Sequence, residues 1–164
     1  MKRNIVWTIF FFAALLLSMA AVASAQDERT CSSARVAGEW GYTETGTIFL
    51  PTGAVPYASV GSYTLDADGN LSGARTASGG GMIQKATIKG TATVNSDCTG
   101  TESLSFYDES GNLLSTAVKA LVYVDNAREV RKIITSVKLP NGVSLPAVLT
   151  TDAKKQFPGR AKEQ

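Results

Sequence analysis

The chain has 164 residues, of which 16 are basic and 14 acidic, so its formal net charge is +2. It contains no histidine, which excludes Ser-His-Asp hydrolysis, Cys-His proteolysis, histidine-ligated zinc or haem, and acid–base catalysis by histidine. Basic residues are scattered rather than collected in a stripe with aromatic residues, which argues against nucleic-acid binding.

The first 25 residues predict an export signal. Lys2 and Arg3 are followed by an almost unbroken apolar run from Ile5 to Leu17, and Ala23-Ser24-Ala25 supplies the small residues that signal peptidase accepts. The apolar run is short for a membrane span, so we expect cleavage and no span in the mature chain. The mature protein would have 139 residues with 14 basic and 14 acidic side chains, and it would be secreted or periplasmic.

Two cysteines, Cys31 and Cys98, lie in the part of the chain that we expect to be exported. In an oxidising compartment an even number of cysteines favours a disulfide, here one that closes a long loop. The alternative is two unpaired thiols. Thiol catalysis is not indicated, because the sequence has neither a CxxC arrangement nor a histidine base.

The chain from Gly38 to Thr150 is typical of short β-strands separated by turns, with frequent valine, isoleucine, threonine and tyrosine. We predict eight strands, at about 38–46, 58–66, 71–78, 82–94, 99–107, 113–124, 128–138 and 143–150. The short connections favour an all-β, single antiparallel up-and-down barrel, because closure removes exposed strand edges. A two-sheet sandwich is the alternative.

The predicted organisation therefore has four parts. Residues 1–25 are the signal peptide, 26–37 an N-terminal segment with a disulfide cysteine, 38–151 the barrel domain and 152–164 a basic polar tail.

The clearest strand runs from Met82 to Val94. Its even positions are mostly apolar or small and its odd positions from Lys85 on are lysine or threonine, so one face meets the core and the other meets water. Gly90 on the inner face suits a tightly curved sheet, where a Cβ would crowd the bend.

The run from Asp66 to Asn70 (DADGN) predicts a hairpin turn rather than a calcium loop. Its glycine is in the fourth position and no glutamate follows at the twelfth. We therefore predict no metal site. The run from Asp108 to Asn112 predicts a second turn of this kind.

The segment from Thr47 to Ala58 (TIFLPTGAVPYA) is apolar and contains two prolines. We expect it to be a long connection between the first two strands, lying over one barrel end. It would be either a lid on a ligand cavity or a plug that caps the core.

Two stretches, Gly61 to Gly73 (GSYTLDADGNLSG) and Gly90 to Thr101 (GTATVNSDCTGT), carry a family resemblance. They resemble small secreted bacterial lipocalin-like (calycin-type) β-barrel proteins, largely of uncharacterised function, although Ala92 stands where an aromatic residue is common. Gly38-Glu39-Trp40 is similar to the Gly-x-Trp of lipocalins, whose tryptophan plugs the closed barrel end. The resemblance implies a barrel, and its turn glycines and aspartates say nothing of chemistry.

Odd and even positions along a strand face opposite sides of the sheet, and this parity gives the candidate ligand-binding residues. Glu102 shares parity with apolar neighbours, and so do Arg75 and Lys132. Burial of all three in the interior would require that they pair there, and a surface or structural ion pair is the alternative. The full candidate set adds the aromatic residues of the predicted strands and of the Thr47–Ala58 segment: Trp40, Tyr42, Phe49, Tyr57, Tyr63, Arg75, Glu102, Phe106 and Lys132. We identify no catalytic residue and no cofactor.

Three functions remain open. The first is an exported barrel that binds a small apolar or amphipathic molecule. The second is a packed structural or interaction barrel of the cell envelope without a ligand. The third is a barrel enzyme of the cyclase type, which rests on analogy of fold alone. The sequence does not give the oligomeric state.

Overall fold

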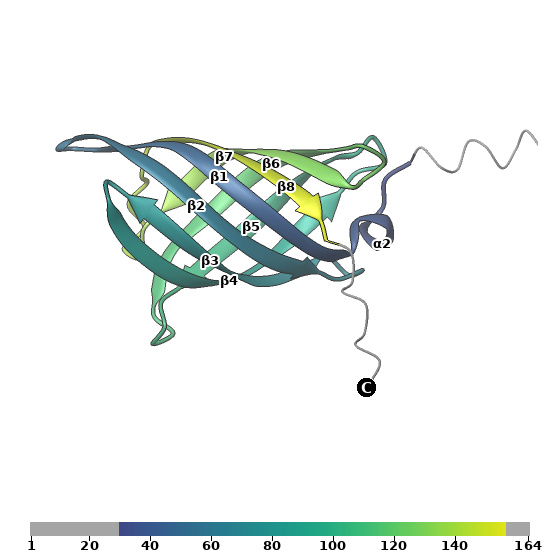
Figure 1. Ribbon diagram of the computed structural model, residues 1–164, viewed down its shortest axis with the longest axis horizontal. Helices are drawn as coiled ribbons and strands as arrows, with labels where there is room; N and C mark the ends of the chain where they lie inside the picture. The colour runs from purple at the N-terminus through teal and green to yellow at the C-terminus, as the bar shows by residue number, and fades with distance from the viewer. Residues whose placement is uncertain (1–29, 157–164) are drawn as a thin grey trace, which may run out of the picture. The chain divides into compact units, whose positions relative to one another are not determined.

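A computed structural model describes residues 30–156 of the chain. Eight antiparallel strands form a closed barrel in sequence order, with β8 pairing back to β1, and the short helix α2 (Ser33–Val36) precedes them (Figure 1). The up-and-down barrel is therefore confirmed, and the two-sheet sandwich is wrong. The predicted signal peptide, and residues 157–164 of the predicted tail, lie outside the described residues.

The strands follow the predicted order. They are β1 (Gly38–Leu50), β2 (Gly53–Leu65), β3 (Asn70–Gly79), β4 (Met82–Val94), β5 (Thr99–Tyr107), β6 (Leu113–Val124), β7 (Glu129–Lys138) and β8 (Ala147–Lys155). The bounds of β4, β5 and β6 are those predicted. Within residues 30–156, no helix has the length and apolar character that a membrane crossing needs.

The segment from Thr47 to Ala58 is not a separate connection, which corrects our expectation. β1 and β2 continue through it as a ladder that ends at Leu50 and Gly53, and the long hairpin extends past the neighbouring strands in Figure 1. Pro56 fits into β2 because its backbone nitrogen needs no partner. Its carbonyl is on the β3 side of the strand, where it accepts a hydrogen bond from Gly80 N at 3.0 Å, and its nitrogen lies on that same side. Since the β2–β3 ladder begins only at Tyr57, the missing N–H of Pro56 costs no ladder bond.

The last strand is also shifted from its predicted position. Residues 143–146 belong to the β7–β8 connection, and β8 extends to Lys155, so residues 152–155 of the predicted tail are strand. Inward-facing Leu149, Thr151 and Ala153 continue the alternation past residue 150. The ladder between β7 and β8 covers five residue pairs, from Glu129–Lys154 to Ile133–Thr150, whereas the β1–β2 ladder covers thirteen.

Figure 1 shows α2 beside one end of the barrel. Aromatic side chains close this end. Trp40 is fully buried, its Nε1 donates to Val36 O at 3.1 Å, and its ring is stacked on Tyr63 with 6.2 Å between centroids. The predicted disulfide is confirmed: Cys31 and Cys98 are bonded and join the N-terminal segment to the β4–β5 turn. Such a bond is typical of proteins in an oxidising compartment.

Two hairpin turns share the pattern D-x-x-G-N and the same hydrogen bonds. In the β2–β3 turn, Asp66 Oδ1 accepts hydrogen bonds from Asp68 N at 2.9 Å and Asn70 N at 2.7 Å. Asp108 Oδ1 accepts from Ser110 N and Asn112 N in the β5–β6 turn in the same way. The D-x-x-G-N sequence therefore forms a side-chain-stabilised turn, with glycine at positive φ in both copies (Gly69, 87°; Gly111, 84°).

Candidate functional site

The barrel interior carries five charged side chains among apolar ones. They are the charged members of the lining of the central gap and of the cavity beyond it: Glu44, Arg75, Glu102, Lys119 and Lys132. Charges in such a place need partners, since removal from water strongly disfavours an unpaired ion. We therefore describe the site by the partners that each of these five side chains has.

Glu102 of β5 and Lys132 of β7 form one buried ion pair. Lys132 Nζ lies 2.5 Å from Glu102 Oε1 and donates a second hydrogen bond to Tyr63 OH at 2.9 Å. Burial, and secondly the nearby Glu102 carboxylate, raise the pKa of Tyr63 well above its ordinary value, so this hydroxyl stays protonated. The gap between these groups and their apolar neighbours is only about 10 Å³, so the middle of the barrel is filled.

Glu44 of β1 and Lys119 of β6 form a second buried ion pair. Lys119 Nζ lies 2.5 Å from Glu44 Oε1 and donates to Thr151 Oγ1 at 2.9 Å, while that hydroxyl donates to Glu44 Oε1 at 3.0 Å. Ser59 Oγ donates to the other carboxylate oxygen at 3.4 Å. Burial lowers the pKa of the Lys119 ammonium, and the Glu44 carboxylate opposes that effect.

Arg75 of β3 is the fifth charge, and it forms no ion pair with any of residues 30–156. Its guanidinium carbon lies 3.6 Å from the centroid of the Phe106 ring and 5.9 Å from that of Tyr57. Its buried Nε and the buried Tyr57 hydroxyl have no hydrogen-bond partner in this part of the chain. Burial raises the pKa of Tyr57, and the Arg75 charge opposes that shift.

A cavity of about 240 Å³ lies at this end of the barrel. Its polar lining includes Glu44, Tyr57, Arg75, Gln84, Ser115 and Lys119. Its apolar lining comes from β1, β5, β6, β7, β8 and the β7–β8 connection: Ile48, Phe106, Leu114, Ala117, Ile134, Val137, Leu139, Leu145 and Leu149. The cavity is thus mainly apolar with a charged floor, and it lies beyond the filled middle of the barrel.

The structure separates the predicted site residues into four groups. Tyr57, Arg75 and Phe106 line the cavity. Tyr42, Tyr63, Glu102 and Lys132 line the filled middle beneath it. Trp40 belongs to the closed end, and Phe49 is 44% exposed and is not part of the cavity lining. Glu102 and Lys132, whose inward orientation parity left open beside a surface ion pair, are both buried and pair with each other.

Glu44 and Lys119 are two interior residues that were not among the predicted site residues. Both lie on predicted strands, and both share parity with buried neighbours: Glu44 with Trp40 and Tyr42, Lys119 with Leu121. The signal that identified Glu102 was therefore present for these two residues as well.

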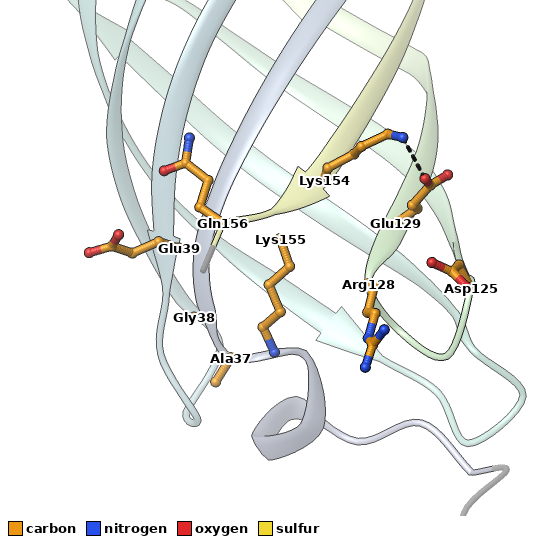
Figure 2. Close-up of a pocket in the computed structure, with 9 residues that line it drawn as sticks. All are labelled: Ala37, Gly38, Glu39, Asp125, Arg128, Glu129, Lys154, Lys155 and Gln156. Atoms are coloured by element: carbon orange, nitrogen blue, oxygen red, sulfur yellow. Dashed lines mark ion pairs between the residues drawn. The ribbon is translucent and has the colours of Figure 1, made fainter. Parts of the chain in front are cut away.

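A second hollow of about 610 Å³ lies outside the barrel, between the start of β1, the end of β8 and the β6–β7 turn (Figure 2). Its Lys154 and Glu129 are paired at 2.7 Å, as the dashed line shows, and Lys155 Nζ donates to Arg35 O at 3.0 Å. Most of its side chains are exposed to solvent. It contains none of the predicted site residues, and the interior cavity is the better candidate.

Comparison with known proteins gives the fold and no family. No family model matches the chain, and no curated protein matches it in sequence. Among solved structures, EF1p2_mFAP2b bound to DFHBI is 14% identical, with a TM-score of 0.53 over 77% of this chain and 100% of that one. The redesigned β-barrel mFAP1, bound to DFHBI, is 17% identical, with a TM-score of 0.48 over 76% and 98%. At 14% identity the likeness to EF1p2_mFAP2b shows the fold alone, an eight-stranded barrel.

Proposed function

We propose that this protein is an exported barrel that binds one small amphipathic molecule in the cavity at the end opposite α2. The observation that carries the proposal is the cavity itself, about 240 Å³ of mainly apolar space with a few polar groups at its floor. Apolar walls with few, well-placed polar groups are the usual composition of a ligand site.

The size of the cavity limits the ligand. Its volume is slightly below the roughly 300–1,000 Å³ of typical ligand pockets, and the ion pairs of Lys119 and Lys132 fill the barrel beneath it. A short chain or single ring therefore fits better than a large polycyclic molecule. The solved barrel EF1p2_mFAP2b, which is bound to DFHBI, supports the idea that such an architecture can hold a small molecule.

A packed structural barrel is the competing function. The filled middle and the aromatic closed end favour it, since both are core. Against it stand Arg75 Nε and the Tyr57 hydroxyl, since these two of the three buried polar side-chain atoms without a partner in residues 30–156 belong to cavity-lining residues; the third is the hydroxyl of Tyr123, whose ring packs against Trp40.

The test is a calorimetric titration of the mature protein with 1-octanol, a short neutral amphipath. We expect saturable binding at one site. In Ala117→Leu the added side-chain carbons enter the cavity, since Ala117 is buried and lines it, and the affinity should fall at least about tenfold, equivalent to about 1.4 kcal/mol.

The matched control is Ala120→Leu, the same change on the exposed face of the same strand. It should bind 1-octanol as the unaltered protein does. Absence of saturable binding in the unaltered protein, or equal binding by Ala117→Leu in a variant shown to be folded, would favour the packed barrel.

A further inference from the structure

The charges inside the barrel do not balance. The carboxylates of Glu44 and Glu102 are each paired with one ammonium, that of Lys119 and that of Lys132, at 2.5 Å. Arg75 is left over, so the five groups carry a formal charge of +1. Because a guanidinium is always ionised, this charge cannot be removed by loss of a proton.

The Arg75 guanidinium is positioned so that the N–H donors along its edge are available to a ligand. The Phe106 ring covers one face at 3.6 Å, an arrangement in which the ring stabilises the cation from above. The N–H donors of a guanidinium lie in its plane, so a face contact uses none of them. Nε is buried and unpartnered, and the residue lines the cavity.

A second orphaned donor lies on the same cavity wall. The Tyr57 ring centroid is 5.9 Å from the guanidinium carbon. Its buried hydroxyl has no partner with hydrogen-bond geometry among residues 30–156, although the Ser59 side chain is near enough to act on its pKa. Burial raises the pKa of this phenol, so the hydroxyl carries its proton at neutral pH and can donate it. Two donor groups without a partner of hydrogen-bond geometry thus occur together, and one of them, Arg75, is also the uncompensated cation.

We propose that the cavity selects an amphipath with a single negative charge, a carboxylate, whose oxygens accept from the Arg75 guanidinium edge and from the Tyr57 hydroxyl. This inference rests on the proposed function and specifies the head group. A carboxylate matches the planar fork of arginine with two parallel hydrogen bonds. It also supplies the one missing negative charge, whereas a dianion would exceed it.

The orientation of the ligand follows from the lining. The head group would lie against Arg75 on β3, and the apolar chain would lie along the opposite walls, where Leu114, Ile134 and Leu149 are found. The Glu44 carboxylate also lines the cavity, but its charge is engaged by Lys119, so it does not repel the head group as a free carboxylate would.

The test compares octanoate with 1-octanol, which have the same chain length and differ in charge. At pH 7.4 we expect octanoate to bind at least about tenfold more tightly, the usual magnitude for a charge-assisted hydrogen bond in a desolvated site. Arg75→Gln should remove this preference by weakening octanoate binding at least about tenfold. Arg75→Lys retains the charge but not the planar fork, so its preference for octanoate should fall less than that of Arg75→Gln. Tyr57→Phe should weaken octanoate binding a few-fold.

The control is Arg128→Gln, which removes one arginine from the exposed β6–β7 turn at the other end of the barrel. It should bind both molecules as the unaltered protein does. Equal affinity for the two molecules, or an undiminished preference in folded Arg75→Gln, would overturn the head-group inference and leave the proposed function standing. Binding of neither molecule would overturn both.

Discussion

Buried charge is the feature with the largest consequence for single residues. The side chains of Glu102 and Lys132 are 1% and 2% exposed. Because water cannot solvate these charges, each depends on its counter-ion more than a charge in a surface ion pair does. Replacing one partner leaves the other as an isolated ion in the interior, whereas replacing both leaves only polar or apolar groups. The same argument applies to Glu44 and Lys119.

We therefore expect Glu102→Gln to lower the free energy of unfolding by about 3–5 kcal/mol, because the Lys132 ammonium loses its counter-ion. The double variant Glu102→Gln with Lys132→Met should be more stable than Glu102→Gln alone. Urea denaturation of the two single variants and the double variant measures both effects. A double variant less stable than either single variant would contradict this account.

Trp40 makes a different kind of contribution, through one hydrogen bond and its volume. Trp40→Phe removes the Nε1 donor from Val36 O and leaves space beside Tyr63 and Tyr123. We expect a loss of about 1–3 kcal/mol in unfolding free energy. Since Trp40 does not line the cavity, the 1-octanol affinity of the folded variant should not change, and a large change would show that the two barrel ends are coupled.

At the scale of elements, the inner glycines decide how closely adjacent strands approach. A Cβ built on Gly90 of β4 would lie 2.2 Å from Ser103 O and 2.9 Å from Leu104 Cδ2. The crowding predicted from the sequence at Gly90 is therefore confirmed, and the neighbouring atoms are mostly backbone, which cannot rotate away.

We expect Gly90→Ala to destabilise the protein by about 1–3 kcal/mol, since β4 and β5 must separate to admit the methyl group. Gly79→Ala is the matched change at a strand end, where the new Cβ would meet only Tyr57 Cδ2 at 3.9 Å. It should be neutral or stabilise by up to about 1 kcal/mol by restricting the unfolded chain. Thermal denaturation of the pair distinguishes the two cases.

The D-x-x-G-N turns give the stability a dependence on acid. Hydrogen bonds from the Asn70 side chain and backbone lower the pKa of Asp66, and those from Asn112 lower the pKa of Asp108. In the unfolded chain aspartate titrates near about pH 3.9. The stabilisation by these turns is thus complete above that pH and is lost as the pH falls through the lowered folded-state values.

We expect the melting temperature to fall between pH 5 and pH 2, and to fall less in the Asp66→Asn/Asp108→Asn variant, which has lost these two titrations. Glu109→Gln, which removes an exposed carboxylate from the same β5–β6 turn, should keep the acid dependence of the unaltered protein. Identical acid limbs in all three proteins would show that the turns do not contribute.

Local signals predicted the elements well where alternation and turn residues agree. β4 lies between a glycine triplet and Asn95-Ser96-Asp97, so both of its ends are marked in the sequence. The β1–β2 hairpin is not evident from the sequence because Pro51 and Pro56 interrupt its apolar run, and only the three-dimensional arrangement shows that Pro56 lies past the end of β3. Parity oriented Glu102 but did not identify its partner, because the stagger of the barrel decides which distant side chains meet.

For the whole molecule, the disulfide is the main long-range constraint. Cys31 and Cys98 are 67 positions apart, and Tyr123 N donates to Cys98 O at 2.8 Å, so the bond ties the N-terminal segment to three strands. We expect Cys31→Ala/Cys98→Ala to lose about 2–4 kcal/mol of unfolding free energy. Octanoate affinity, measured on the folded fraction, should be retained because the cavity is at the other end.

The short ladder between β7 and β8 has a kinetic consequence. With five paired residues it is the briefest of the eight ladders in the ring, and the cavity wall beside it includes Leu139, Leu145 and Leu149. Local opening requires least free energy where the fewest backbone bonds must break. We expect amide hydrogens of β8 to exchange with deuterium sooner than those of β4, and octanoate to slow that exchange. Ligand entry and release would then be limited by the rate at which the β7–β8 ladder opens, well below the rate of diffusional encounter.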